Sequence, residues 1–484
     1  MTTTATEIKR TDLFIDNEWH AAESGERFQV INPATEEVIA EVAKAGAADV
    51  DAAVRAAKKC FESDEWNAMT ARHRGVLLGK AADILSERTA EIARLETLHN
   101  GKTLFESTID VSQTVDTMRY YAGWADKVAG DTLPSNGPFF IYTLKEPVGV
   151  VGAIVPWNFP LNLASWKFAP ALAAGCTVVL KPATETPLTA LAMADIMVEA
   201  GFPPGAFNVV PGTGSVAGNA LVLHPDVNKV AFTGSTPVGQ QIMRDAADTV
   251  KRVSLELGGK SPNIIFADAD LKSAVRGAQN GIFYGKGEVC AAGSRLLVER
   301  SVHDQVVEEL VARSKKLLPG DPLVKGTRLG PVVSKKQQET VMSYIEAGRK
   351  DANLVAGGNT ATVDGRGYYV EATVFDDAKP GMSIVDEEIF GPVLAVLTFD
   401  GVDEGIALAN QTIYGLAAGI WTRDIQRAHR VARAIKAGTV WINTYNFYDP
   451  GAPFGGYKAS GFGRDLGKES LEGYLETKTV WVGL

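Results

Sequence analysis

The stretch VGVVGAIVPWNFPLNLASWKFAPALAAGCTVVLKPAT, residues 148–184, carries the pattern that decides the fold. It opens with a run of Val, Ile, Gly and Ala (148–155), continues with a Leu- and Ala-rich segment (161–174) and closes with a second β-branched run (177–181). Short β-branched runs predict buried strands, and the longer segment between them predicts a helix. A strand, a helix and a strand in this order predict a right-handed βαβ crossover, and therefore a parallel sheet.

The same alternation continues toward the C-terminus in two series, which predicts two α/β units. In the first series, further strands are predicted at Phe207–Val210, Lys229–Phe232 and Arg252–Glu256, with helices at Pro187–Ala200, Ser215–Leu223 and Thr236–Asp248. In the second series, strands are predicted at Asn263–Phe266, Arg295–Val298 and Thr439–Asn443, with helices at Leu271–Gly281, Val302–Leu318 and Lys335–Lys350. Upstream, Leu13–Trp19 is typical of a strand and Ala47–Tyr121 has helical periodicity. The extended pieces Phe139–Leu144 and Tyr474–Val482 fit neither series, and we expect them to pair outside the two main sheets.

Composition and charge narrow the class of protein. The chain has 484 residues, of which 45% are hydrophobic and 22% charged, which is ordinary for a globular protein too long for one core. The net charge of −10 argues against nucleic acid or an anionic membrane as a partner, since either selects for a basic surface. The three cysteines (Cys60, Cys176 and Cys290) form no disulfide framework, which suits a reducing compartment. With no signal-like or membrane-length apolar stretch, we expect a cytoplasmic protein.

Two glycine clusters and one lysine bear on a nucleotide cofactor. The run Gly212–Gly218 places its third glycine one residue too late for the usual dinucleotide fingerprint. The run Phe232–Gly239 lies between a predicted strand and helix, where small residues give a phosphate access to free helix amides. A plain strand–helix turn accounts for that run equally well. Lys181 ends a predicted parallel strand, at the sheet edge where ligands bind, although a surface lysine is the commoner case.

Cys290 is the strongest candidate for a nucleophile. It lies in the loop Tyr284–Arg295, whose small residues leave room for a substrate carbon, whereas Cys60 and Cys176 lie in contexts typical of packing. The six histidines fall outside the glycine-rich motifs, and neither HExxH nor CxxC spacing occurs, so we predict no metal site. Glu256 ends an apolar strand before two glycines. Such a carboxylate is either a costly buried charge or a base with a raised pKa.

Seven motifs in a fixed order resemble those of the aldehyde dehydrogenase superfamily, and the resemblance spans essentially the whole chain. They are Pro156–Pro160, Lys181–Ala183, Phe232–Thr236, Leu255–Lys260, the Cys290 loop, Glu387–Pro392 and Pro453–Lys458. The resemblance implies an NAD(P)⁺-dependent enzyme that oxidises an aldehyde to a carboxylic acid through a thioester. One rival is a CoA-acylating aldehyde dehydrogenase, whose members generally lack the Glu256 base. Another is a non-catalytic crystallin-like relative, against which Cys290, Glu256 and Asn158 argue together.

The resemblance also implies catalytic roles. Cys290 is then the nucleophile, and the Asn158 side-chain amide and the Cys290 backbone N–H hold the oxyanion. Glu256 activates water for deacylation. Lys167 forms a proton relay with Asp465, although many members carry Glu at the second of these positions.

The implied cofactor is NAD⁺ or NADP⁺, held by an atypical Rossmann domain, which accounts for the failed fingerprint. Thr184 stands where strictly NAD⁺-dependent members usually carry Glu, whose charge repels a 2′-phosphate, so NADP⁺ becomes acceptable. Lys286 and Glu288 replace the amides that usually precede the cysteine. The residues implied to surround the cofactor are Trp157, Lys181, Thr184, Gly214, Phe232, Gly234, Ser235, Gly239, Leu257, Glu388 and Phe390.

The implied substrate tunnel is apolar and aromatic. Its members are Phe159, Leu163, Trp166, Tyr284, Val289, Ala291, Tyr448 and Phe454. No Arg or Lys falls among these positions, so an acidic semialdehyde lacks an evident partner. Phe454 stands where recognition of betaine aldehyde usually adds Trp. We therefore expect a medium-chain aliphatic or an aromatic aldehyde.

By the same resemblance, the fold is α/β with three parts. Residues 1–131 and 148–257 form a discontinuous cofactor-binding domain of atypical Rossmann type, and residues 258–470 form an α/β catalytic domain. Residues 132–147 and 471–484 form a β oligomerisation arm. An arm of this kind exposes strand edges that need partners, so we expect a homodimer or homotetramer.

Overall fold

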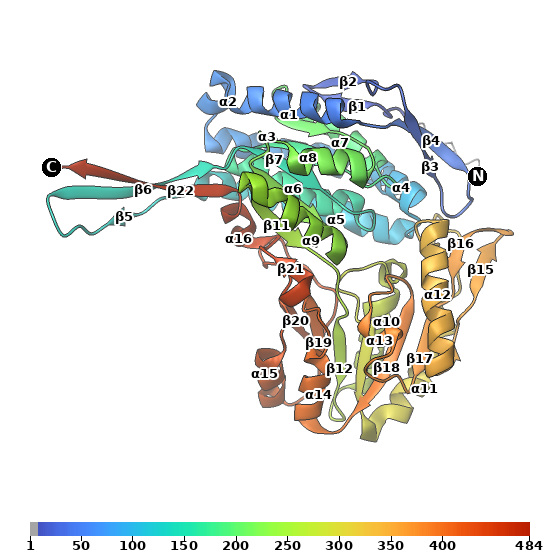
Figure 1. Cartoon of the computed structure of the whole chain (residues 1–484). Coiled ribbons are helices and arrows are strands. Elements are labelled where there is room, and N and C mark those ends of the chain that lie inside the picture. Colours follow the sequence, from blue (N-terminus) through green and yellow to red (C-terminus); the bar gives the residue numbers. More distant parts are fainter. Residues whose placement is uncertain (1–7) are drawn as a thin grey trace.

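The computed structural model describes residues 8–484 and contains two α/β units and a projecting arm (Figure 1). The first sheet has the order β2 (Glu18–His20), β1 (Leu13–Ile15), β9 (Phe207–Val209), β8 (Thr177–Lys181), β7 (Val150–Ile154), β10 (Lys229–Thr233), β11 (Arg252–Glu256) and β21 (Gly461–Phe462). β7 to β11 are parallel, whereas β1 pairs antiparallel with β9 and β21 pairs antiparallel with β11. Counted from β7, the parallel strands follow the order 3-2-1-4-5, which is that of the Rossmann fold.

Helices cover both faces of the first sheet because successive side chains of a strand point in opposite directions. On β8, Val178 and Leu180 join one apolar cluster and Val179 joins another. The first cluster includes side chains from α2 (Asp64–Ala68), α3 (Ala71–Glu87), α4 (Thr89–Asn100), α5 (Leu104–Trp124), α6 (Pro160–Ala174) and α7 (Leu188–Ala200). The second includes side chains from α1 (Ala47–Phe61), α8 (Asn219–Leu223) and α9 (Thr236–Ala246).

The second sheet has the order β14 (Asn353–Ala356), β17 (Thr373–Asp376), β18 (Val393–Phe399), β13 (Arg295–Glu299), β12 (Pro262–Ile265), β19 (Ala417–Trp421) and β20 (Thr439–Ile442). Each neighbouring pair is parallel except β14 with β17. One face packs against α10 (Leu271–Phe283) and α11 (His303–Ser314). The other packs against α12 (Lys335–Asp351), α13 (Ser383–Asp386), α14 (Gly401–Asn410) and α15 (Ile425–Ala434). The chain then returns to the first unit, where α16 (Gly467–Glu472) contacts α6.

The arm is a three-stranded sheet of order β22 (Leu475–Gly483), β6 (Phe139–Pro147) and β5 (Thr132–Leu133), and it projects from the first unit (Figure 1). β22 pairs antiparallel with β6 of the same chain, so that Thr477 lies opposite Lys145 and Trp481 lies opposite Ile141. This pairing confirms that the two extended pieces lie outside the main sheets. It also leaves β22 as an edge strand of the arm.

The α/β prediction is confirmed, and three local differences have physical causes. The predicted strand Leu13–Trp19 is a hairpin of β1 and β2, because Asp16 and Asn17 adopt positive φ angles and turn the chain. The predicted helix Ser215–Leu223 starts as a π-helix over Gly214–Gly218, where its terminal glycines weaken regular helix formation. The predicted helix Val302–Leu318 ends at Ser314, ahead of Pro319.

Several strands lie outside the predicted ones. They are β5, β14, β17, β18, β19 and β21, the hairpin of β3 (Arg27–Ile31) with β4 (Val38–Ala43), and the hairpin of β15 (Thr360–Val363) with β16 (Arg366–Val370). Within residues 8–484, no helix is both long and apolar enough to cross a membrane.

Candidate active site

The two units meet at the carboxyl edge of the first sheet, beyond the ends of β7 and β10. The strand order reverses between these two strands, because β8 lies on the far side of β7 and β11 on the far side of β10. Ligands of open α/β sheets bind at such a switch point. A cavity of about 310 Å³, called here the switch-point cavity, lies there. Its walls are Pro156–Asn158, Thr233–Ser235, Leu257, Gly258, Cys290, Gln337, Thr340 and Glu388–Phe390.

Six of the predicted cofactor residues line the switch-point cavity, namely Trp157, Gly234, Ser235, Leu257, Glu388 and Phe390. The Trp157 and Phe390 rings meet edge to face, with centroids 5.1 Å apart. Glu388 Oε1 accepts a hydrogen bond of 3.0 Å from the Gly259 N–H, and burial raises the pKa of Glu388 to about 7. A Cβ at residue 258 would collide with Glu388 Oε2, so Gly258 is needed where this carboxylate approaches the backbone.

The other five predicted cofactor residues lie along the first sheet beside this cavity, but outside its lining. Lys181 ends β8, and burial lowers its pKa to about 8. Thr184 Oγ1 donates to Gly212 O at 3.3 Å and thereby joins the loops after β8 and β9. The remaining three residues are Gly214 at the start of the π-helix, Phe232 on β10 and Gly239 on α9, where it packs against Leu257.

These groups together fit a dinucleotide. α9 begins beside the cavity at Thr236, and its N-cap Ser235 makes no side-chain capping bond, so amides at this end remain available to a phosphate. The Lys181 ammonium and the Glu388 carboxylate are suited to the hydroxyl groups of two riboses. The donor set of this edge therefore matches the predicted NAD⁺ or NADP⁺.

Cys290 follows a tight turn that comes directly after α10. Gly285, Lys286 and Gly287 have φ angles of 57°, 64° and 71°, a left-handed conformation that is unusual for lysine. A Cβ at residue 287 would collide with the backbone of Gly391, so this glycine allows the loop to pack closely. Burial, followed by the nearby carboxyl groups of Glu388 and Glu256, raises the pKa of Cys290 to about 12. A raised pKa of this kind favours the protonated thiol over the thiolate.

Asn158 lies directly beside the Cys290 loop. Its Nδ2 donates to Glu288 O at 3.0 Å, two residues before the cysteine, and one N–H of the amide remains. Asn100 holds the backbone on the other side, because its Nδ2 donates to Trp157 O at 2.7 Å. The asparagine predicted to bind the oxyanion thus lies on the same cavity wall as Cys290.

Glu256 ends β11 within a group of buried charges. Its side chain is 4% exposed, and neither carboxylate oxygen has a hydrogen-bond partner in the described part of the chain. Burial, reinforced by the charge of Asp465, raises its pKa well above the ordinary value, and Lys167 opposes that rise. Lys167 Nζ lies 2.5 Å from Asp465 Oδ2 in a buried ion pair. The structure therefore brings together the predicted base and both members of the predicted relay.

A second buried ion pair joins Lys286 and Glu288, the two residues that replace the usual amides before Cys290. Lys286 Nζ is 2.8 Å from Glu288 Oε2, and both side chains are 1% exposed. Lys286 also donates to the backbone oxygen and to Oδ1 of Asn100. Glu106 accepts from the Gly285 N–H at 2.8 Å. Asn100 and Glu106 were not among the predicted site residues, and no local sequence signal marks them, because they reach the loop from α4 and α5.

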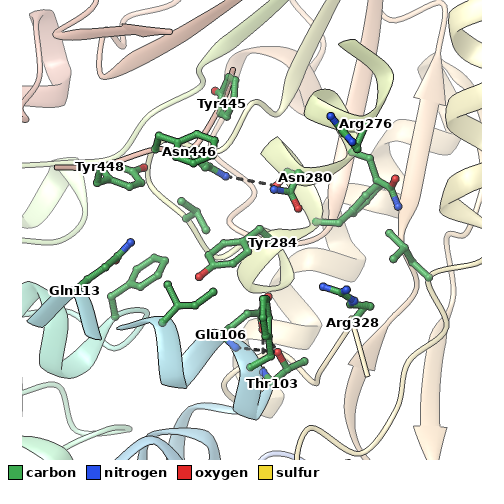
Figure 2. A pocket seen from close by; sticks show the side chains of 18 residues that line it. Thr103, Glu106, Gln113, Arg276, Asn280, Tyr284, Arg328, Tyr445, Asn446 and Tyr448 are labelled. Atoms are coloured by element: carbon green, nitrogen blue, oxygen red, sulfur yellow. Dashed lines mark hydrogen bonds between the residues drawn. The ribbon is translucent and has the colours of Figure 1, made fainter. Parts of the chain in front are cut away.

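The predicted substrate residues gather on the other side of Cys290. All eight belong to one apolar cluster or pack against it: Phe159, Leu163, Trp166, Tyr284, Val289, Ala291, Tyr448 and Phe454. Beside them lies a cavity of about 590 Å³, called here the α10 cavity, lined among others by Phe159, Tyr284, Val289 and Tyr448 (Figure 2). Its wall also contains Arg276 and Arg328, which the sequence prediction missed.

Residues 19–480 match the aldehyde dehydrogenase family. The chain is 49% identical to aldehyde dehydrogenase 1A1 of Gallus gallus, over 98% of this chain and 94% of that protein. It is 48% identical to the mitochondrial aldehyde dehydrogenase of Homo sapiens, over 98% and 92%. Among solved structures, the NAD⁺ complex of an aldehyde dehydrogenase from Bacillus cereus matches with a TM-score of 0.97 and 51% identity, over 98% of this chain and 97% of that one.

Proposed function

Because the chain belongs to the aldehyde dehydrogenase family, we propose a specific role for each reactive group between the two cavities. The protein is an NAD(P)⁺-dependent oxidoreductase that converts an aldehyde to its carboxylic acid. One observation carries the assignment of roles. The Cys290 thiol and the Asn158 amide line the same cavity wall, and Glu256 lies close enough to raise the pKa of that thiol.

Cys290 acts as the nucleophile. Its thiol must lose a proton before attack, because its pKa is raised to about 12. The sulfur then bonds to the aldehyde carbon, and the carbonyl oxygen becomes an oxyanion that accepts from the free N–H of Asn158 and from the Cys290 backbone N–H. Bound NAD(P)⁺ supplies the acceptor for the hydride that leaves this carbon, and a thioester remains on Cys290.

Glu256 acts as the base for hydrolysis of that thioester. A carboxylate whose pKa is raised by burial is a stronger base than an ordinary one, so it can take a proton from water and return it within one cycle. The water oxygen bonds to the thioester carbon, the carbon–sulfur bond breaks, and the acid leaves with Cys290 restored. The Lys167–Asp465 pair lies near enough to shift the pKa of Glu256 in both directions, which supports a role in moving its proton.

The body of the substrate is an apolar chain or an aromatic ring. Three rings support this choice, because Trp166, Tyr448 and Phe454 have centroids 5.5–6.1 Å apart and contribute to the apolar cluster against which Cys290 packs. For the cofactor, Thr184 is neutral and half-buried beside Gly212, so no negative charge at residue 184 opposes a 2′-phosphate. NADP⁺ is therefore accepted along with NAD⁺.

The arm joins copies of the chain into a homodimer or homotetramer in the cytoplasm. In support, the edge strand β22 offers unpaired backbone groups, and Trp481 on it is 61% exposed. Phe139 and Phe140 on β6 are also exposed. All three cysteines are free thiols, which suits a reducing compartment.

Two substitutions test the assigned roles with an aromatic aldehyde and either cofactor. Cys290→Ala should abolish NAD(P)H formation while the fold and cofactor binding persist, and the matched control Cys60→Ala should keep its activity. Glu256→Gln should release a burst of about one NAD(P)H per active site and then stall, since the base is assigned to deacylation. Loss of the burst together with steady turnover would mean that Glu256 also takes the proton of the Cys290 thiol. Substantial turnover by Cys290→Ala would overturn the nucleophile assignment. Steady turnover by Glu256→Gln at the wild-type rate would exclude Glu256 as the base.

A further inference from the structure

The α10 cavity contains charge that an apolar substrate does not explain. Besides the rings near Cys290, its wall includes Arg276 on α10 and Arg328 in the segment between α11 and α12. Figure 2 places both arginines on one side of the cavity, across from Gln113 and Tyr448. Two separate parts of the chain therefore bring positive charge to the same opening.

Both arginines are exposed to solvent, and no carboxylate within residues 8–484 pairs with either of them. In the described chain, residues 8–484, neither Arg276 nor Arg328 forms a hydrogen bond or an ion pair. Arg328 lies over the Phe105 ring instead, with its guanidinium carbon 5.3 Å from the ring centroid. Glu106 is the one carboxylate among the described lining residues, and its oxygens already accept from Thr103 and from the Gly285 N–H. The guanidinium donors thus remain available to a ligand.

The side of the cavity formed by α10 is polar as well as cationic. Gln279 and Asn280 follow Arg276 by one helical turn and line the same wall. Asn446 faces them, and its Nδ2 lies 3.4 Å from Asn280 O (Figure 2). The cavity therefore combines amides and two arginines with the rings of Phe159, Tyr284 and Tyr448, which pack against the same apolar cluster as Cys290.

On the basis of the proposed function, we propose that the preferred substrate is an aldehyde whose far end carries an anionic group, of carboxylate or phosphate type, bound by Arg276 and Arg328. Guanidinium groups donate in pairs to such oxygens. The aromatic residues hold the body of the molecule between that end and Cys290. Because the chain has a net charge of −10, local positive charge is also what draws an anionic ligand to this opening. This proposal differs from the sequence expectation that acidic semialdehydes lack a partner, because that expectation considered only the eight predicted tunnel residues.

The test uses three aldehydes that differ at the end remote from the reacting carbon. They are 4-carboxybenzaldehyde, 4-formylphenyl phosphate and the neutral methyl 4-formylbenzoate. The variants are Arg276→Gln, Arg328→Gln and their combination. Matched controls are Lys272→Gln on α10 and Lys325→Gln near Arg328, since both lysines are exposed and lie outside the cavity lining. Each control removes the same charge from the same segment.

Two readouts separate binding from chemistry. Turnover is measured as kcat/KM from NAD(P)H formation, and binding is measured by calorimetry on Cys290→Ala, which forms no thioester. In the wild type, at least one anionic aldehyde should exceed the ester about tenfold in kcat/KM, and salt should reduce that advantage. Each arginine variant should lower the advantage about two- to fivefold, and the combined variant should remove it. The lysine controls should retain it.

The outcomes are distinguishable. Equal kcat/KM and equal affinity for the ester and both anions overturn the anion site and leave the proposed function intact. The anion site is also overturned if the lysine controls reduce the preference for the anionic aldehyde as much as the arginine variants do. If Cys290→Ala binds an anion preferentially through the arginines while the wild type forms no NAD(P)H from any aldehyde, the anion site stands and the proposed function fails. The anion with the larger advantage identifies the group that is bound.

Discussion

The buried ion pair behind Cys290 predicts a large loss of stability in Glu288→Gln. Lys286 Nζ lies 2.8 Å from Glu288 Oε2 and both side chains are 1% exposed, so the substitution leaves a buried ammonium without its counter-charge. At that distance and an effective dielectric near 20, the attraction is about 6 kcal/mol before desolvation is counted. Removing one partner of a buried pair costs about 3–5 kcal/mol. Since Lys286 keeps two hydrogen bonds to Asn100, we expect the loss in the free energy of unfolding near about 3 kcal/mol.

The loss should depend on pH. Burial lowers the pKa of Lys286, and Glu288 is the main group that raises it. Without Glu288, the folded state holds fewer protons at this lysine than the unfolded chain does between the lowered pKa and the ordinary lysine value. The free energy of unfolding of the variant therefore rises with pH through that window. The double variant Lys286→Gln with Glu288→Gln leaves no buried charge and should recover most of the loss.

Thermal unfolding followed by circular dichroism, at neutral and at mildly alkaline pH, measures these effects. The matched control is Glu37→Gln, which breaks the exposed pair with Arg366, whose side chains are 53% (Arg366) and 63% (Glu37) exposed. That control should cost less than about 1 kcal/mol. If Glu288→Gln unfolds at the wild-type temperature, or if the double variant is no more stable than the single one, the reasoning from the ion pair is refuted.

Two further predictions concern the cofactor and the arm. Thr184→Glu should raise the KM for NADP⁺ about tenfold and spare NAD⁺, since each charge pair with the 2′-phosphate is repulsive by roughly 4 kcal/mol before screening. An unchanged ratio of kcat/KM for the two cofactors would mean that residue 184 does not set the cofactor preference. Deleting the tail from Gly473 removes β22 and opens the edge of β6, so light scattering should detect a smaller or an aggregated species. An oligomer of unchanged size would refute the role of the arm.

Much of the fold was predictable because its signals are local. The alternation of β-branched runs and Ala-rich segments from residue 148 to residue 256 identifies each strand and helix within a short window. The buried polar contacts around Cys290 carry no such signal. Asn100 contacts Lys286 across 186 positions of sequence, and Glu106 contacts Gly285 across 179. Neither contact follows from the residues beside it, because only the packing of α4 and α5 against the loop creates it.

Arg276 is a different case, because a pattern for it exists in the sequence. The helix predicted over Leu271–Gly281 leads directly into the Cys290 loop, and residues three, four and seven positions after Arg276 share its face. Those residues, Gln279, Asn280 and Phe283, all line the α10 cavity. Extending the helical pattern past Gly281 would have placed Arg276 on the face that lines the α10 cavity. Arg276 lies outside the seven family motifs, which is why the resemblance alone does not mark it.

Glu256 links the chemistry of the site to its stability. Its pKa is raised by burial, so the folded state holds a proton that the unfolded chain has lost between the ordinary Glu value and the raised one. The free energy of unfolding of the wild type falls as pH rises through that window, by up to about 1.4 kcal/mol per pH unit. Residue 256 has no proton to lose in Glu256→Gln. The unfolding temperature of this variant, measured relative to that of the wild type, should therefore increase from mildly acidic to alkaline pH. A constant difference would mean that Glu256 titrates near its ordinary pKa and is already charged in mild acid. The Lys167–Asp465 pair would then have no proton to exchange with it.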